Sequence, residues 1–172
     1  MSENWNEPFG KIASAFKSFS GIARRQELRG EAHGVKVIDD FGHHPTAIVN
    51  TLRALRHRYR DHRLWAVFEP RSNTTRRAVF QQQLPEALKV ADGVFISQVA
   101  RLEQIPEDQR LKPERVVAAI AKDGRPAFYE QNADAIVDRI VPMLRPKDVV
   151  VVFSNGGFDN IHEKLLARLR EL

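Results

Sequence analysis

The sequence predicts an α/β protein of Rossmann-like type, with a largely parallel sheet of about six strands flanked by helices. Short apolar runs typical of strands buried on both faces, such as LWAVFE and DVVVVF, alternate with segments whose apolar residues recur at helical spacing. Polar or glycine-rich stretches follow the strands and precede the helices. This alternation implies right-handed crossovers, with helices on both faces of the sheet.

The first part of the chain is expected to contain a helix, a strand pair and a second helix. Residues 8–19 show helical periodicity, and Gly21 marks the stop. Gly30 and Gly34 bracket two short strands, of which the second is Val35 to Ile38. A helix follows from Thr46 to Tyr59, with four inward residues: Ile48, Leu52, Leu55 and Tyr59.

The rest of the chain continues the alternation. Four strands are expected, at Leu64 to Glu69, Gly93 to Ser97, Pro126 to Glu130 and Asp148 to Phe153. Four helices are expected, with inward residues Phe80, Leu84 and Leu88; Val116, Val117 and Ile120; Ile136, Ile140 and Met143; and Ile161, Leu165, Leu169 and Leu172. Pro113 starts the second of these, Asn132 caps the third, and Asn160 with Glu163 forms a capping box for the fourth. The polar segment 97–113 is either a functional loop or a surface connection.

Length and composition limit the possible classes. A chain of 172 residues with 42% hydrophobic and 28% charged residues fits one globular domain. No apolar run approaches the ~20 residues of a membrane span, and MSENWNEPFG lacks a signal-peptide core, so a cytoplasmic location is expected. The absence of cysteine excludes disulfides, thiolate zinc sites, iron–sulfur clusters and cysteine nucleophiles.

The chain is basic, with 27 Lys and Arg against 22 Asp and Glu, which favours anionic partners. The densest basic run, Arg53 to Arg63, lies between apolar residues at helical spacing. Its arginines are therefore expected on the solvated face of a helix. Specific nucleic-acid binding is not expected, because no recognised module signature accompanies the run.

Polar side chains follow three of the expected strands. In open α/β sheets, ligands bind outside the carboxyl ends of the strands, so these residues predict a basic, hydrogen-bonding site with two titratable imidazoles. The three groups are Asp39, Asp40, His43 and His44; Arg71, Asn73 and Arg76; and Ser154, Asn155, Gly156 and Gly157.

Each group also has a plainer interpretation. Helix capping by one aspartate, with Pro45 in the first turn, does not explain the second aspartate or the two histidines. A functional role is therefore favoured for this group. The Ser/Asn/Thr cluster after the second strand is compatible with capping, but Arg71 is suited to hold a carboxylate or phosphate. The two glycines are equally compatible with an anion site at a helix N-terminus and with a tight turn.

Three motifs resemble a known family. DDFGHHPT at 39–46 resembles the opening motif of the C-terminal domain of the Mur ligases, ATP-dependent amide-forming enzymes of peptidoglycan synthesis. FEPRSNTTR at 68–76 and SNGGFDNIH at 154–162 are most similar to the branch that joins L-alanyl-γ-D-glutamyl-meso-diaminopimelate to UDP-N-acetylmuramate in murein recycling. The branch that adds L-alanine typically has a QPHRYTRT-like second motif, with arginine in place of Ser72, and lacks SNGGF.

The resemblance implies a fold, a reaction and partners. The family has a domain for the UDP-sugar, a P-loop domain for ATP and this C-terminal domain, expected over residues 1–172, for the amino acid or peptide. No GxxxxGK[ST] P-loop is present. The chain is therefore expected to be a domain of a larger ligase and inactive alone. In the reaction that the family implies, ATP with Mg²⁺ phosphorylates the UDP-N-acetylmuramate carboxylate, and the peptide amine attacks the acyl phosphate.

The resemblance also implies residue roles. Asp40 and either Arg24 or Arg25 approach the nucleotide, although the residues alone suggest solvated charge for Arg24, Arg25 and Arg29. His43 and His44 lie beside the acyl phosphate and amine, where a neutral imidazole accepts a proton or orients the nucleophile. Arg71, Asn73 and Arg76 hold tripeptide carboxylates; Ser154, Asn155, Gly156 and Gly157 complete the rim.

Other interpretations remain open at this point. The chain could belong to the alanine-adding branch, or be a stand-alone α/β module that binds nucleotides or anions. A nucleic-acid-binding domain rests only on the arginine run. A metal hydrolase is disfavoured, and no metal ligand is assigned, because adjacent His43 and His44 cannot easily face one ion and the chain has no HExxH motif.

Overall fold

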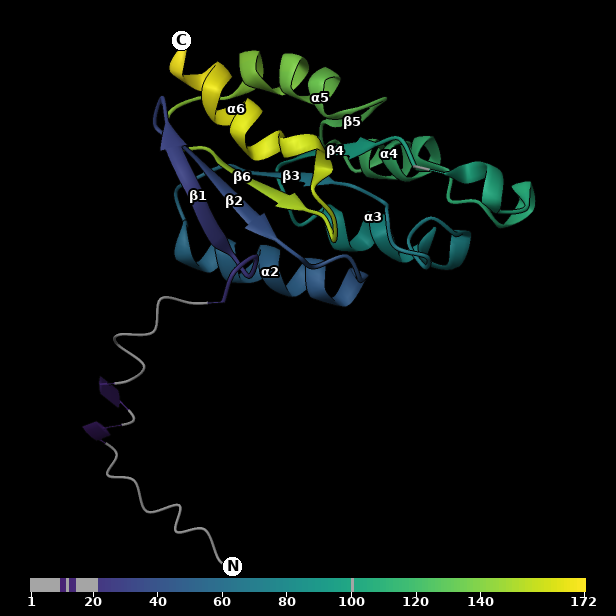
Figure 1. Cartoon of the computed structure of the whole chain (residues 1–172), viewed down its shortest axis with the longest axis horizontal. Coiled ribbons are helices and arrows are strands. Elements are labelled where there is room, and N and C mark those ends of the chain that lie inside the picture. Colours follow the sequence, from purple (N-terminus) through teal and green to yellow (C-terminus); the bar gives the residue numbers. More distant parts are fainter. Residues whose placement is uncertain (1–9, 12, 15–21, 100) are drawn as a thin grey trace, which may run out of the picture.

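The computed structural model describes residues 10, 11, 13, 14, 22–99 and 101–172. Within them, six strands form one sheet in the order β1-β2-β6-β3-β4-β5 (Figure 1). The strands are β1 (Glu27–Ala32), β2 (Val35–Asp40), β3 (Leu64–Phe68), β4 (Gly93–Ser97), β5 (Ala127–Glu130) and β6 (Val149–Phe153). The predicted fold class is confirmed. Most of the helix predicted over 8–19 lies outside the described residues.

Helices cover both faces of the sheet (Figure 1). On one face lie α2 (Pro45–Arg58), α3 (Gln83–Leu88) and α4 (Pro113–Lys122); on the other lie α5 (Ala133–Ile140) and α6 (Ile161–Arg170). Short 3₁₀ turns complete the chain at Ala78–Phe80, Leu102–Gln104, Glu107–Gln109, Val141–Met143 and Phe158–Asn160. The layers are those of a doubly wound α/β domain.

The strand β6 lies at the centre, between β2 and β3, and is parallel to both. Val151 and Phe153 pack against the α2–α4 side, whereas Val150 and Val152 pack against the α5–α6 side. Because both faces are covered, the strand reads as a continuous apolar run rather than an alternating one. Only β1 is antiparallel; it joins β2 through a tight turn in which His33 and Gly34 have φ of 49° and 72°.

The start of α2 differs from the simple capping interpretation. His44, and not an aspartate, is the N-cap, since its Nδ1 accepts a hydrogen bond from the Thr46 amide at 3.2 Å. Pro45 occupies the first turn as expected, because its missing N–H needs no partner there. Asp40 instead accepts from the Gly42 amide at 2.7 Å, and so shapes the turn after β2.

Two expectations about the last helix were wrong. Asn160 has φ of 54° and makes no side-chain cap, because Phe158, Asp159 and Asn160 form a left-handed turn before α6 begins. The capping box with Glu163 therefore does not form. Leu172 lies beyond the end of the helix and is 65% exposed, so it is not part of the buried face.

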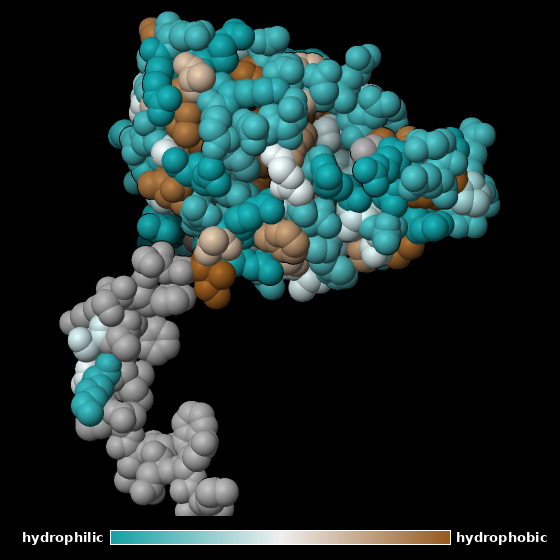
Figure 2. Space-filling model, in the orientation of Figure 1, coloured by the Kyte–Doolittle hydropathy of each residue, from teal (hydrophilic) through white to brown (hydrophobic). Residues whose placement is uncertain are grey.

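The arginine run also needs correction. Arg53, Arg58 and Arg60 are exposed as predicted, but Arg56 and Arg63 are half-buried and hold aspartates at the amino end of the sheet. Most of the surface in Figure 2 is hydrophilic, with hydrophobic residues in small patches. In the described part of the chain, no helix combines the length and apolar character that crossing a membrane requires.

Candidate functional site

The carboxyl ends of β2, β6 and β3 lie side by side. Asp40 pairs with Phe153, and Phe153 pairs with Phe68, in the two parallel registers. The three polar groups predicted from the sequence follow these strand ends directly. Their convergence at one edge of the sheet, where α/β proteins bind ligands, is therefore confirmed.

The two histidines differ in what their rings can do. His43 is half-buried, and its Nδ1 lies 3.1 Å from the carbonyl oxygen of Phe41. A carbonyl only accepts, so Nδ1 carries the proton in neutral His43, and Nε2 is free to accept one. His44 is exposed and its Nδ1 already accepts from Thr46, so its neutral form carries the proton on Nε2. His43 is thus suited to accept a proton and His44 to donate a hydrogen bond.

Asp40 lies beneath the site edge. It is 3% exposed, and its carboxylate accepts from the amides of Gln26 at 3.0 Å and Gly42 at 2.7 Å. The hydroxyl of Thr51 lies 3.4 Å away. These contacts occupy both carboxylate oxygens and tie the segment before β1 to the turn before α2.

Arg24 and Arg25 have different surroundings. Arg24 donates from Nε to Asp39 at 3.1 Å and from Nη2 to the carbonyls of Ser154 at 2.6 Å and Gly156 at 2.9 Å. Arg25 is exposed, and its guanidinium lies 5.5 Å from the centre of the Phe41 ring. Of the two, Arg25 is the arginine with donors available to a nucleotide.

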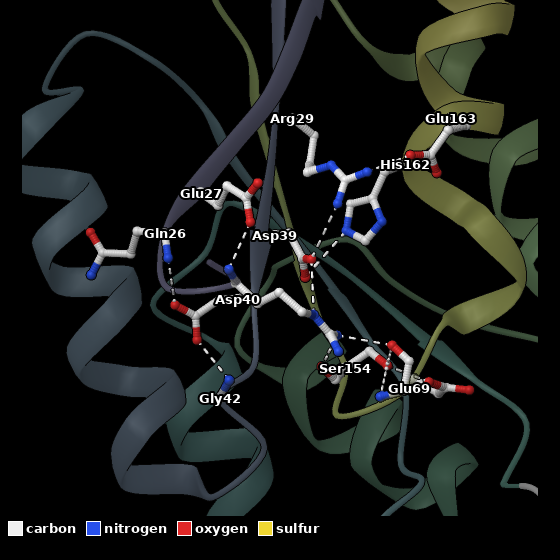
Figure 3. A network of polar contacts seen from close by, with 12 residues as sticks. Gln26, Glu27, Arg29, Asp39, Asp40, Gly42, Glu69, Ser154, His162 and Glu163 are labelled. Atoms are coloured by element: carbon white, nitrogen blue, oxygen red, sulfur yellow. Dashed lines mark hydrogen bonds and ion pairs between the residues drawn. The ribbon is translucent and has the colours of Figure 1, made fainter. Parts of the chain in front are cut away.

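The second strand end places Arg71 at the surface and Glu69 below it. Glu69 is buried, and its Oε2 accepts a hydrogen bond of 2.5 Å from the hydroxyl of Ser154 (Figure 3). Arg71 Nη1 lies 3.5 Å from Glu69 Oε1, a weak ion pair that leaves most of its donors unused. Ser72 is structural, since its hydroxyl accepts from the amide of Thr75 at 3.1 Å and holds the following turn.

Two hollows that share lining residues lie beside Arg71. The first, the arginine groove, has a volume of about 380 Å³ and is lined by Arg71, Asn73, Arg76 and Arg101. The second, the acidic groove, has a volume of about 480 Å³ and includes Glu69, Glu103 and Asp159. Arg71 and Arg101 line both, so one end of the combined surface is cationic and the other carries three carboxylates.

Sequence reasoning missed Arg101, which belongs to segment 97–113. The Arg76 side chain reaches this segment, with Nη1 3.4 Å from the Arg101 carbonyl, and the Leu111 amide donates to the Arg76 carbonyl at 3.0 Å. The segment thus forms a wall of the grooves. Glu69, Asn132 and Asp159 were missed as well. Their position after strand ends was a usable signal.

Of the two glycines, Gly156 is needed for close packing and Gly157 is not. A Cβ at Gly156 would lie 2.5 Å from Arg71 Nε, whereas a Cβ at Gly157 would meet nothing within 4 Å. The Gly156 amide already donates to the Ser154 hydroxyl at 2.9 Å, and α6 begins only at Ile161. The tight-turn interpretation fits better here than an anion site at the helix N-terminus. Asn155 is half-buried, and its Oδ1 has no hydrogen-bond partner among the residues that the structure describes.

The family model described as "Mur ligase, glutamate ligase domain" matches residues 24–156. The chain belongs to the Mur ligase family. The Mur ligase match includes the first two motifs whole and the start of the third. The matched range thus includes most of the sheet edge that carries the grooves.

Among curated Mur ligases, the UDP-N-acetylmuramate–L-alanyl-γ-D-glutamyl-meso-2,6-diaminoheptandioate ligase of Escherichia coli K12 is 43% identical over 90% of this chain and 32% of its own length. The UDP-N-acetylmuramate–L-alanine ligase of Pelotomaculum thermopropionicum is 36% identical over 95% of this chain and 35% of its own. The crystal structure of a murein peptide ligase from Psychrobacter arcticus 273-4 superposes with a TM-score of 0.76 at 34% identity, covering 92% of this chain and 32% of that one. The chain thus spans about a third of the length of these relatives.

Proposed function

We propose that this Mur ligase domain is the peptide-binding C-terminal domain of an ATP-dependent ligase. The ligase joins the tripeptide L-alanyl-γ-D-glutamyl-meso-diaminopimelate to UDP-N-acetylmuramate through an acyl phosphate, in the cytoplasm. UDP-sugar and ATP-binding domains would complete the enzyme. The higher identity to the tripeptide ligase than to the alanine ligase, 43% against 36%, supports this assignment.

The observation that carries the proposal is the polarity of the two grooves. Meso-diaminopimelate ends in a free amino-acid group, so a binding site needs a cation for the carboxylate and carboxylates for the ammonium. Arg71, Arg76 and Arg101 supply the cationic side, and Glu69, Glu103 and Asp159 lie on the acidic side. Glu103 is the carboxylate most open to an ammonium, since Glu69 already accepts from Ser154 and Asp159 already pairs with Lys164. A guanidinium holds a carboxylate through two parallel hydrogen bonds, which fixes orientation as well as charge.

The size of the site favours the tripeptide over alanine. The acidic groove alone, at about 480 Å³, falls in the range of sites that enclose drug-sized ligands. A single alanine would leave most of it empty. Ser72, which stands where the alanine-adding branch has an arginine, is committed to the turn with Thr75.

The remaining roles follow the geometry. His43 Nε2 would accept a proton from the attacking amine, and the exposed His44 would orient the acyl phosphate. Asn73 would support Arg76, to which it is hydrogen bonded at 2.7 Å, and Asn155 with the Gly156-Gly157 backbone would border the peptide. Ser154 would not contact the peptide directly. Its hydroxyl would hold the Glu69 carboxylate, to which it donates a hydrogen bond.

Mur ligases use ATP and Mg²⁺, and we propose that both are held mainly by another domain. From this chain only Arg25 and the Asp40 turn would approach the nucleotide. Both carboxylate oxygens of Asp40 already accept hydrogen bonds from backbone or hydroxyl donors. Among the described residues, no group of three or more His, Asp or Glu side chains is arranged to hold a metal, so we assign no metal-dependent step to these residues.

A ligation assay with the complete ligase tests the proposal. With ATP, Mg²⁺ and UDP-N-acetylmuramate, the tripeptide should be joined efficiently and L-alanine should be joined poorly. Efficient use of L-alanine, with no use of the tripeptide, would assign the chain to the alanine-adding branch.

The 172-residue chain alone should neither hydrolyse ATP nor ligate. ATP hydrolysis that copurifies with the chain through several columns would contradict this expectation. Duplex DNA should bind only weakly, since specific complexes reach roughly 10⁻⁸ to 10⁻¹¹ M at physiological salt. Affinity in that range would favour a nucleic-acid-binding function instead.

A further inference from the structure

Asp39 is a buried carboxylate that none of the proposed ligand contacts uses. It is 2% exposed and lies at the end of β2, one residue before Asp40. Three cationic or titratable groups from different segments surround it. Arg29 Nη1 lies at 3.9 Å and His162 Nε2 at 3.4 Å (Figure 3), and Arg24 Nε lies at 3.1 Å. Glu163 lies on the outer side and pairs with Arg29 at 2.6 Å.

Arg24 connects Asp39 to the loop after β6. Its Nε faces the carboxylate, while its Nη2 donates to the carbonyls of Ser154 and Gly156. A guanidinium is planar, so a carboxylate that fixes one edge also fixes the direction of the other donors. The position of the Gly156 carbonyl therefore depends on the orientation of Asp39.

Gly156 in turn contacts the proposed peptide-binding arginine. A Cβ at this glycine would lie 2.5 to 2.7 Å from Nε, Cδ and Cζ of Arg71. The Arg71 guanidinium thus rests directly on the backbone of Gly156. A shift of the loop would move the surface on which Arg71 lies.

His162 completes the arrangement from α6. It is 5% exposed, and although its Nε2 lies 3.4 Å from Asp39 Oδ1, neither atom makes a hydrogen bond of good geometry. Leaving two buried polar atoms unpaired costs free energy, so a small rotation that closes the bond is favoured. The motif SNGGFDNIH ends at this histidine, and no role in ligand binding accounts for it.

We propose that Asp39 and His162 are positioning residues that aim Arg71 through Arg24 and the Gly156 backbone. They touch no substrate. His162 orients the Asp39 carboxylate, Asp39 holds the Arg24 guanidinium, and Arg24 fixes the loop on which Arg71 rests. The consequence for peptide binding rests on the function proposed above, whereas the mechanical link does not.

The alternative is that Asp39 merely stabilises the domain, and the chain offers a matched control for this. Asp92 accepts from Arg56 Nη2 at 2.7 Å, and Arg56 also donates to the carbonyls of His62 and Val90, both at 3.2 Å. The arrangement is similar, with one carboxylate and two carbonyls on one arginine, but it lies at the amino end of the sheet, and Asp92 is 33% exposed where Asp39 is 2% exposed. Asp92→Asn removes such an arginine contact without a link to Arg71.

Nuclear magnetic resonance of the 172-residue chain tests the link directly. In Asp39→Asn, the Gly156 amide should exchange at least about tenfold faster, the equivalent of losing ~1.4 kcal/mol of local protection. The order parameter of the Arg71 Nε–H bond should fall. Asp92→Asn should change neither. Unchanged signals in folded Asp39→Asn, or equal changes in Asp92→Asn, would overturn the proposal.

A second pair of variants keeps the test decisive if Asp39→Asn does not fold. His162→Gln retains a donor, whereas His162→Phe retains bulk without one. The phenylalanine variant should show faster exchange of the Gly156 amide and greater motion of the Arg71 side chain. The glutamine variant should show both changes to a smaller extent. Equal behaviour of the two variants would make His162 a packing residue and refute its role.

Kinetics in the complete ligase connect the link to function. Asp39→Asn should raise the KM for tripeptide several-fold and leave the KM for ATP nearly unchanged. An unchanged tripeptide KM, beside a loosened Arg71 signal, would refute positioning of the substrate. Absence of tripeptide ligation in the unaltered enzyme would instead refute the proposed function, and the resonance experiment would still decide the mechanical link.

Discussion

The two ends of the sheet both carry arginines, but they use them differently. At the amino end, Arg63 holds the buried Asp148 through two hydrogen bonds of 2.8 and 2.6 Å, and Asp148 also accepts from the Arg145 amide and Trp65 Nε1. At the carboxyl end, the 3.5 Å contact with Glu69 is the one ion pair that Arg71 makes within the described residues. Among the residues that the structure describes, Arg76 and Arg101 have no ion pair with an acidic side chain, although Arg76 donates to three uncharged oxygens: Asn73 Oδ1, Gln104 Oε1 and the Arg101 carbonyl.

The comparison shows that composition alone does not distinguish a structural arginine from a binding one. The distinction lies in whether the guanidinium donors are already used. Paired donors stabilise the fold, whereas donors that face a groove remain available to a ligand. Closed pairs also occur at the open end of the sheet, where Arg24 holds Asp39 and Arg139 holds Glu130.

The largest expected effect is at the amino end. Asp148→Asn breaks the pair with Arg63 and should lower the free energy of unfolding by about 3 kcal/mol, the lower limit for a broken buried pair, since Arg63 is partly exposed. Urea denaturation measures this. Tripeptide binding by the folded variant should be unchanged; a parallel loss of affinity would erase the difference between the two ends.

At the carboxyl end, Arg71→Lys should affect binding and not stability. The charge remains but the planar fork is lost, so the apparent KM for tripeptide should rise roughly tenfold to hundredfold, as expected for ~1.5–3 kcal/mol. The KM for ATP should change much less. Steady-state kinetics of the complete ligase, with each substrate varied in turn, give both values. Equal effects on both substrates would make Arg71 a structural residue.

A smaller effect should follow from the glycine under Arg71. In Gly156→Ala, the added methyl group would displace the flexible Arg71 side chain, so tripeptide affinity should fall several-fold with little change in unfolding temperature. Gly157→Ala is the control, because its methyl group meets open space. Titration calorimetry of both variants sharpens the comparison, and identical affinities would mean that Arg71 does not depend on Gly156.

The smallest effect concerns acid stability. Burial raises the pKa of Asp39, but the adjacent His162 and Arg24 outweigh it and hold that pKa below its ordinary value. The folded state therefore favours the charged carboxylate, whose stabilisation is present above the ordinary pKa and lost as pH falls through the folded one. Between pH 7 and pH 2, the unfolding temperature of Asp39→Asn should fall less steeply than that of the unaltered chain. The same pH dependence in both proteins would mean that the ionisation of Asp39 is not coupled to folding.

Much of the fold was predictable from the sequence, for a physical reason. Strands covered on both faces must be continuously apolar, and LWAVFE, GVFIS and DVVVVF stand out for that reason. Local sequence patterns gave a wrong prediction where tertiary contacts determine the backbone conformation. Asn160 resembles a helix cap, but the left-handed turn before α6 gives it another conformation.

The candidate site was predictable in part. Because parallel strands end at the same edge, Arg71 and the residues after β2 and β6 could be placed together before their strand order was known. Arg101 and the contacts of Asp39 could not. They depend on which strands are neighbours and on how segment 97–113 folds back, and neither is encoded in a local pattern.

The central position of β6 has a consequence for how the domain is made. This strand is the last of the six to leave the ribosome, yet it must insert between β2 and β3, which are synthesised much earlier. Until then, the two earlier strands expose unpaired edges and apolar faces, which favour aggregation. Nascent chains that stall before Val149 should therefore depend on chaperones, and the grooves around Arg71 can form only after the strand is complete.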